Sequence, residues 1–234
     1  MESIIAIIPA RGGSKRIARK NIKKFYGKPI IAYSIEAALE SGIFSKVVVT
    51  TDDPEIALIA EKYGAEVPFL RPEDLSDDFT PVDMVIKHVL ESLGARGEQY
   101  DYYATIYATA PLIDSKYLVH AFNSLKASDA VNAFSCTSMP FPIQRTFKIN
   151  DNNRCEMFWP ENFNKRSQDL EEAYQDAGQF YLTKLAKKST KVMFSEDSLP
   201  IVIPRYLVQD IDTMEDWFRA EKMYQANTDE KYIN

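Results

Sequence analysis

The alternation of short β-branched runs with helical stretches constrains the fold of this chain more than any other feature. The runs "IIAII" and "KVVVT" are continuous and apolar, as expected for strands that are buried on both faces of a parallel sheet. Strands and helices that alternate at this length predict a doubly wound, mainly parallel α/β sheet with right-handed connections. In such a sheet, ligands bind beyond the carboxyl ends of the strands.

Cap residues set the expected boundaries of the helices. Asp53 and Asp114 are expected N-caps, and Thr80 and Thr213 are each followed three residues later by an aspartate, as in a capping box. The predicted helices are residues 29–40, 54–63, 81–93, 115–127 and 214–226. The predicted strands are residues 4–8, 46–50, 67–70, 102–107, 129–135 and 206–212.

Residues 139–174 interrupt the alternating pattern with several prolines, many aromatic residues and no sustained period. We predict a single domain over residues 1–234, because this length suits one sizeable α/β core. Within it, residues 139–174 would form an irregular excursion. The excursion could be a dimerisation arm, a lid or part of a binding site for a small molecule.

Composition narrows the possible partners. The chain has 34 acidic and 28 basic side chains and a formal net charge of −6, which disfavours nucleic acid as a partner. No apolar stretch approaches the roughly 18 residues of a membrane helix, so we expect no membrane partner. Cys136 and Cys155 cannot build a disulfide framework, and the two histidines lie too far apart for a zinc site with them. We expect a cytoplasmic protein.

A cluster of cations follows the first predicted strand, in "PARGGSKRIARKN". The cluster does not match a Walker A loop, and it lacks the third glycine of a dinucleotide fingerprint. The remaining alternatives are a triphosphate loop of another kind and an ordinary solvated turn. In the first, the amides of Gly12 and Gly13, the Ser14 hydroxyl and the cations Arg11, Lys15, Arg16 and Lys20 would meet phosphate oxygens.

The segment "IPARGGSKRIARKNIKKFYGKPIIAYSIEAAL" resembles the opening of the cytidylyltransferases that activate acidic sugars, the CMP-sialic acid synthetase family. The segment "VVVTTDDPEIALIAEKYGAEVPFLRPEDLSDD" and the "DID" before the last helix are also similar to that family. The resemblance implies a Rossmann-like nucleotidyltransferase that uses CTP and Mg²⁺ and forms a homodimer. It implies a role in glycan biosynthesis such as flagellin glycosylation.

The resemblance carries phosphate contacts onto the basic loop and places Arg71 near the cytosine base. The match around Asp78 and Thr80 is only partial, because a serine that the family often carries is absent. Lys20, Arg11 and Asp212 are the expected catalytic residues. The expected nucleotide contacts are Arg11, Gly12, Gly13, Ser14, Lys15, Lys20, Asn21, Arg71, Asp78 and Thr80.

Asp210 and Asp212 are the predicted metal ligands. In a strand they would point to one face, and Mg²⁺ commonly uses one or two carboxylates together with phosphates and water. The alternative is that Asp212 only favours the N-terminus of the following helix. Asp52 and Asp53 suggest another metal motif, but we prefer Asp53 as the N-cap before Pro54.

The next question is which sugar acid would accept the CMP group. "FPIQR", "MFWPENFNKRSQDL" and "YQDAGQFY" resemble the branch of the family that uses pseudaminic acid, a nine-carbon acid with two acylamino groups and a terminal methyl. Tyr107 stands where N-acetylneuraminate enzymes carry a sugar-binding glutamine. N-acetylneuraminic or legionaminic acid is the alternative acceptor, and a non-catalytic CTP-binding regulatory subunit is the alternative of another class. The expected sugar contacts are Tyr107, Gln144, Arg166, Gln168, Asp176 and Gln179.

Overall fold

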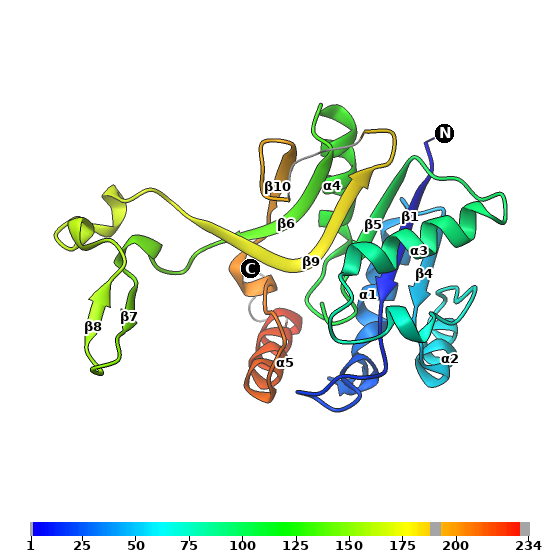
Figure 1. Cartoon of the computed structure of the whole chain (residues 1–234), viewed down its shortest axis with the longest axis horizontal. Coiled ribbons are helices and arrows are strands. Elements are labelled where there is room, and N and C mark those ends of the chain that lie inside the picture. The colour runs from blue at the N-terminus through cyan, green and yellow to red at the C-terminus, as the bar shows by residue number, and fades with distance from the viewer. Residues whose placement is uncertain (1, 188–192, 230–234) are drawn as a thin grey trace.

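The computed structural model of the chain describes residues 2–187 and 193–229, which form a six-stranded sheet with helices on both faces (Figure 1). The strand order is β10-β6-β9-β5-β1-β4. Strand β1 pairs in parallel with β4 and β5, and β10 pairs in parallel with β6, whereas β9 runs antiparallel between β5 and β6. The strands are β1 Ile4–Pro9, β4 Lys46–Thr50, β5 Tyr102–Ile106, β6 Asn132–Ser138, β9 Tyr174–Lys184 and β10 Ser198–Val202.

The side chains of β1 show why this sheet is covered on both faces. Ile4, Ala6 and Ile8 pack in one core cluster with residues of α1, α2 and α4. Ile5 and Ile7 pack in another cluster with residues of α3. The prediction of a doubly wound, mainly parallel α/β sheet is therefore confirmed. The helices are α1 Ile30–Ser41, α2 Pro54–Lys62, α3 Val82–Gly94, α4 Ser115–Ala127 and α5 Met214–Thr228.

Three of the predicted helix caps are confirmed. The Asp53 carboxylate accepts hydrogen bonds from the backbone N–H groups of residues 55 and 56, and Asp114 accepts one from residue 116. Thr213 and Asp216 form a reciprocal capping box at the start of α5. Helix α1 ends at Gly42, whose φ of 65° is the left-handed conformation that glycine adopts at low cost.

Some local predictions are wrong. Residues 67–70 form no strand, because the chain makes only an isolated bridge between Glu66 and Val48 before it turns. Residues 206–212 are not a strand either: β10 ends at Val202 and a 3-10 turn over Arg205–Leu207 follows. Thr80 does not cap α3, because its hydroxyl donates to Asp77 Oδ1 instead.

The sequence patterns also missed β9 and misplaced β6. Strand β9 occupies a central place in the sheet, between β5 and β6. The strand predicted at residues 129–135 begins at Asn132 and continues to Ser138. Within residues 2–187 and 193–229, no helix combines the length and apolar character needed to cross a membrane.

Residues 139–173 leave the sheet and project as an arm (Figure 1). The arm contains a short antiparallel hairpin, β7 Phe147–Ile149 with β8 Cys155–Met157, and several 3-10 turns. Large apolar side chains on the arm remain exposed, with Phe141 at 78% and Phe163 at 70%. Exposed apolar surface of this kind is typical of an interaction surface.

Candidate active site

A cavity of about 530 Å³ lies at the carboxyl ends of β1 and β5. Three segments line it: the basic loop after β1, the loop that leads from residue 71 into α3, and the turn after β5. The lining residues include Arg11, Ser14, Lys15, Arg16, Lys20, Asn21, Arg71, Asp78, Thr80 and Tyr107. Most of the predicted nucleotide contacts therefore surround one cavity, at the edge of the sheet where ligands of such folds bind.

The basic loop is held by its own residues. The Asn21 side-chain amide donates to the Arg11 carbonyl at 2.9 Å, which closes the loop across its base. Arg19 adopts a left-handed φ of 54° and forms an ion pair with Asp53. Its guanidinium also lies 2.6 Å from Glu55 Oε2. These contacts keep Lys20, the next residue, directed into the site.

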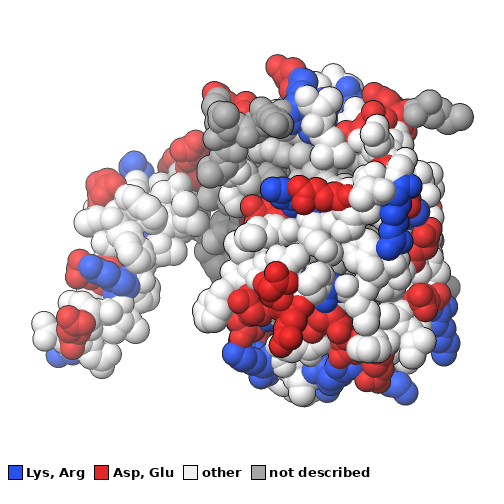
Figure 2. Space-filling view, turned by 45° about the vertical axis from the view of Figure 1, so that its right-hand side comes forward, with Lys and Arg blue, Asp and Glu red and all other residues white. Residues whose placement is uncertain are grey.

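Each cation of the loop that faces the cavity has a carboxylate partner in the ligand-free chain. Arg11 Nη1 lies 2.5 Å from Asp78 Oδ1, and Lys15 forms an ion pair with the same carboxylate. Hydrogen bonds from Lys15 and Arg11 hold the pKa of Asp78 below its usual range. Asp78 thus supplies the negative charge that these two cations face. Figure 2 shows basic and acidic side chains interspersed on one face of the molecule.

Asp212 is the carboxylate partner of the other two cations. Its Oδ1 lies 2.7 Å from Arg16 Nη2 and 3.7 Å from Lys20 Nζ. The Lys20 ammonium also donates to the Ile211 carbonyl at 2.7 Å. Burial lowers the pKa of Lys20, and the charge of Asp212 opposes that shift.

The segment that contains Asp210 and Asp212 is not a strand. Both carboxylates nevertheless lie outside the core, because the side chain of Ile211 between them is fully buried. Partial burial raises the pKa of Asp210, and the negative charge of Asp212 raises it further. The helix cap of α5 is made by Thr213 and Asp216, so the Asp212 carboxylate is not needed there. In the described part of the chain, no group of three or more histidine, cysteine, aspartate or glutamate residues could hold a metal ion.

Two further residues behave differently from expectation. The Gly12 amide donates to Asp52 Oδ1 at 3.0 Å, so it is not free to meet a phosphate. Gly12 is required instead for close approach, since a Cβ there would lie 2.7 Å from Asp53 Oδ2, whereas Gly13 faces open space. The Asp53 carboxylate pairs with Arg19 and accepts hydrogen bonds from the first backbone amides of α2. These contacts argue against a metal motif at Asp52 and Asp53.

Arg71 lines the cavity with a buried guanidinium. The residue is 6% exposed, and its Nε and Nη2 atoms have no hydrogen-bond partner within the described residues. Burial lowers its pKa, and the charge of Asp52 opposes this effect. A buried guanidinium with unused donors can bind the acceptor atoms of a planar base.

The predicted sugar contacts fall into three groups. Tyr107 and Asp176 line a second cavity of about 320 Å³ that shares Tyr107 with the first. Gln144, Arg166 and Gln168 lie on the arm instead and line neither cavity; the Gln144 amide donates to the Glu171 carbonyl, and Arg166 Nε lies 2.7 Å from Asp169. The remaining predicted contact, Gln179, is buried and donates to the Leu207 carbonyl at 2.6 Å. It therefore holds the turn that precedes Asp210.

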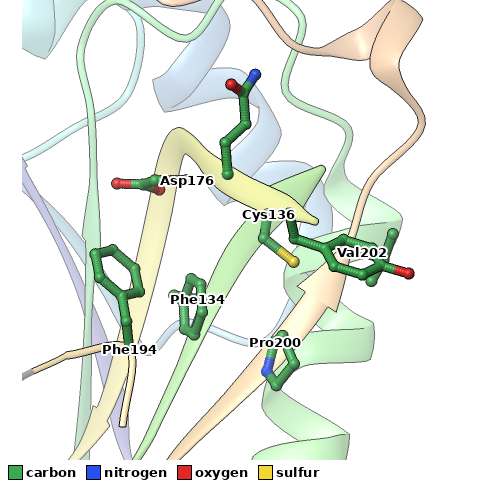
Figure 3. A pocket seen from close by; sticks show the side chains of 8 residues that line it. Phe134, Cys136, Asp176, Phe194, Pro200 and Val202 are labelled. Atoms are coloured by element: carbon green, nitrogen blue, oxygen red, sulfur yellow. The ribbon is translucent and has the colours of Figure 1, made fainter. Parts of the chain in front are cut away.

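The second cavity contains residues that sequence reasoning missed. Tyr181 on β9 donates to Asp176 Oδ2 at 2.5 Å, and its ring lies 5.5 Å from that of Tyr107. Phe194 lines both this cavity and an adjoining apolar one of about 610 Å³. Figure 3 shows Phe134 and Phe194 beside Asp176 in that apolar cavity, and the two phenyl rings are 4.8 Å apart. Tyr181 lies in the quoted segment "YQDAGQFY" but was not named as a contact, because the pairing of β9 was not foreseen, and no sequence signal marked Phe194.

Comparisons with known proteins agree with this geometry. The cytidylyltransferase family model matches residues 5–226. Pseudaminic acid cytidylyltransferase of Campylobacter jejuni is 46% identical over 224 residues, which are 95% of this chain and 97% of that protein. CMP-N,N'-diacetyllegionaminic acid synthase of Legionella pneumophila is 33% identical over 234 residues, 96% of this chain and 97% of that protein.

A solved structure supports the fold separately. A CMP:2-keto-3-deoxy-manno-octonic acid synthetase complexed with CTP has a TM-score of 0.69 to this chain at 15% identity, and the match covers 97% of this chain and 100% of the other. At that identity the likeness concerns the fold alone. The family model spans nearly the whole chain, and the sequence identity to curated relatives is high. The chain therefore belongs to the cytidylyltransferase family.

Proposed function

We propose that this protein transfers CMP from CTP to the anomeric hydroxyl of pseudaminic acid, giving CMP-pseudaminic acid and pyrophosphate. The observation that carries the proposal is the single cavity that the cations of the basic loop line, two of which, Arg16 and Lys20, form ion pairs with Asp212. The identity of 46% to a pseudaminic acid cytidylyltransferase supports the choice of acceptor.

The basic loop would bind the triphosphate. Arg11, Lys15 and Lys20 offset its charge, while Ser14 and Asn21 line the same wall of the cavity. The acceptor hydroxyl attacks the α-phosphorus, and pyrophosphate leaves in line. Such a reaction depends on positioning and on charge stabilisation at the phosphoryl oxygens. Lys20 is suited to that task, because the Ile211 carbonyl and Asp212 hold its ammonium group in place.

Asp210 and Asp212 fit a Mg²⁺ ion by the chemistry of their donor set. Two carboxylates that repel each other are stabilised by a divalent cation, and substrate phosphates and water commonly complete its coordination. When bound, the ion would draw electron density from the phosphates and stabilise the leaving pyrophosphate. Carboxylate oxygens are ligands that suit a hard cation.

The acceptor would lie in the second cavity, beside Tyr107. This placement is supported by Tyr107 and Val82, which line both cavities, because attack requires the sugar hydroxyl next to the α-phosphate. Asp176 and Tyr181 offer polar contacts there, and Phe194 offers an apolar wall. A sugar with a terminal methyl and acyl groups suits a cavity of this mixed character.

The arm supports the proposal of a homodimer. Gln144, Arg166 and Gln168 lie on the arm and line neither cavity of their own chain, so in this conformation their contact with the sugar would require a second copy. The exposed phenylalanines on the arm would be buried in such an assembly. A cytoplasmic location, and the use of the product in flagellin glycosylation, remain predictions.

The test is to incubate the purified protein with CTP, Mg²⁺ and a panel of nonulosonic acids and to measure pyrophosphate. We expect release with pseudaminic acid. Release with only N-acetylneuraminic or legionaminic acid would replace the proposed acceptor. Binding of CTP without pyrophosphate from any acid would favour the regulatory subunit.

A further inference from the structure

Asp52 and Asp53, which follow strand β4, hold the two ends of the turn that carries the phosphate-binding cations. Asp52 Oδ1 accepts a hydrogen bond from the Gly12 amide at 3.0 Å. Asp53 forms an ion pair with both terminal nitrogens of Arg19, and the longer of the two contacts is 3.2 Å. Residues 13–18 lie between these anchors and include three polar side chains that line the cavity. The turn is therefore pinned at both ends to one strand end.

Asp52 also faces the guanidinium of Arg71. The oxygen that accepts from Gly12 lies 3.6 Å from Arg71 Nη2. The Arg71 backbone amide donates to the Thr51 carbonyl at 2.8 Å, so Arg71 is held against the same strand end. Among the residues that the structure describes, Asp52 is the one acidic side chain within ion-pair distance of Arg71. A single carboxylate oxygen thus contacts the phosphate-binding turn and faces the buried cation.

We propose that Asp52 is a positioning residue. It fixes the distance between the phosphate-binding turn and Arg71, so that the triphosphate and the base of CTP are bound at the same time. Arg11 and Arg71 line the cavity, whereas Asp52 is not among its lining residues in the described chain. Because the Asp52 carboxylate contacts the Gly12 amide and faces Arg71, we assign its effect to these neighbours. The inference rests on the proposed use of this cavity for CTP, with Arg71 on the side of the base.

The test compares Asp52→Asn with the wild type. Asparagine keeps an oxygen for the Gly12 amide but removes the charge that faces Arg71. We expect the KM for CTP to rise about tenfold, because a charge-assisted contact is weakened. The kcat should change less than about threefold, since Lys20 and Asp212 are untouched. The preference for CTP over UTP should fall, and this loss should vanish in an Arg71→Met background.

Asp114→Asn is the matched control, because it makes the same chemical change at a helix cap outside the cavity lining. An unchanged KM and base preference in Asp52→Asn would overturn the inference. A fall of kcat together with a lower urea midpoint would also overturn it, because the variant would then be damaged as a whole. If the wild type itself releases no pyrophosphate from CTP, the proposed function fails, and the inference, which rests on it, fails with it. Should Asp52→Asn not fold, calorimetry of CTP binding to Asp52→Glu replaces it, and an unchanged Kd there refutes the role.

Discussion

Replacing Arg71 by methionine should separate function from stability. Arg71 is 6% exposed, and two of its guanidinium nitrogens lack hydrogen-bond partners among the described residues. A buried polar group left unsatisfied costs about 1–3 kcal/mol. The carboxylate of Asp52 at 3.6 Å offsets only part of that cost, because the Asp52 side chain is 30% exposed and screened by water. Methionine keeps the apolar stem and removes the charge.

We expect Arg71→Met to leave the free energy of unfolding unchanged or to raise it by about 1–2 kcal/mol. The same change should raise the KM for CTP about 10- to 100-fold, because the charged hydrogen bond that we propose from Arg71 to the base would be lost. Urea unfolding followed by circular dichroism measures the first quantity, and pyrophosphate release measures the second. Arg96→Met, at an exposed arginine over the Phe69 ring, is the control and should alter neither by much. A loss of more than about 1 kcal/mol in Arg71→Met would refute the reasoning, since the guanidinium would then be well satisfied.

Three other predictions concern the turn after β1, the cap of α2 and the arm. Gly12→Ala should lower kcat/KM for CTP at least about tenfold, because a Cβ would lie 2.7 Å from Asp53 Oδ2, whereas Gly94→Ala, in open space, should not. The Arg19 guanidinium holds the pKa of Asp53 below its usual range, so its stabilisation is present above about pH 4 and is lost as the pH falls through the lowered value. Asp53→Asn should therefore flatten the dependence of the unfolding free energy on pH below about pH 4, and an unaltered acid profile would contradict the assignment. Phe163→Glu, at a side chain that is 70% exposed on the arm, should shift the protein from dimer to monomer in light scattering; a monomeric wild type would refute the dimer.

Local signals in the sequence predicted those parts of the fold that local physics decides. The apolar run of β1 and the Asp53 cap each act within a few residues, so their patterns were sufficient. Strand β9 was missed because Gly178 and several polar residues break its pattern, and pairing with β5 and β6 decides its structure. The alternation around Asp210 was mistaken for a strand because Ile211 is buried in a second core cluster and not in the sheet.

The site shows the same division between local and long-range effects. The motif after β1 predicted which cations would line the cavity, because their positions follow from one strand and one turn. It could not predict the partner of each cation. Asp78 reaches Arg11 from a loop that is distant in sequence, and Asp212 reaches Arg16 from the far end of the chain. The contribution of Tyr181 and Phe194 likewise depends on a sheet order that no local pattern specifies.

These ion pairs explain how a chain with an excess of acid can carry a cluster of cations in one turn. Arg11 and Lys15 share Asp78, and Arg16 and Lys20 share Asp212, so one carboxylate offsets half of the positive charge of each pair. Without those carboxylates the cations would repel one another across a short loop. A triphosphate that binds here as we propose would compete with these carboxylates for the same cations. Its affinity would then depend on the difference between its own contacts and those of Asp78 and Asp212. Only a ligand with several charges at the right spacing gains enough from that exchange, which disfavours small monovalent anions in this cavity.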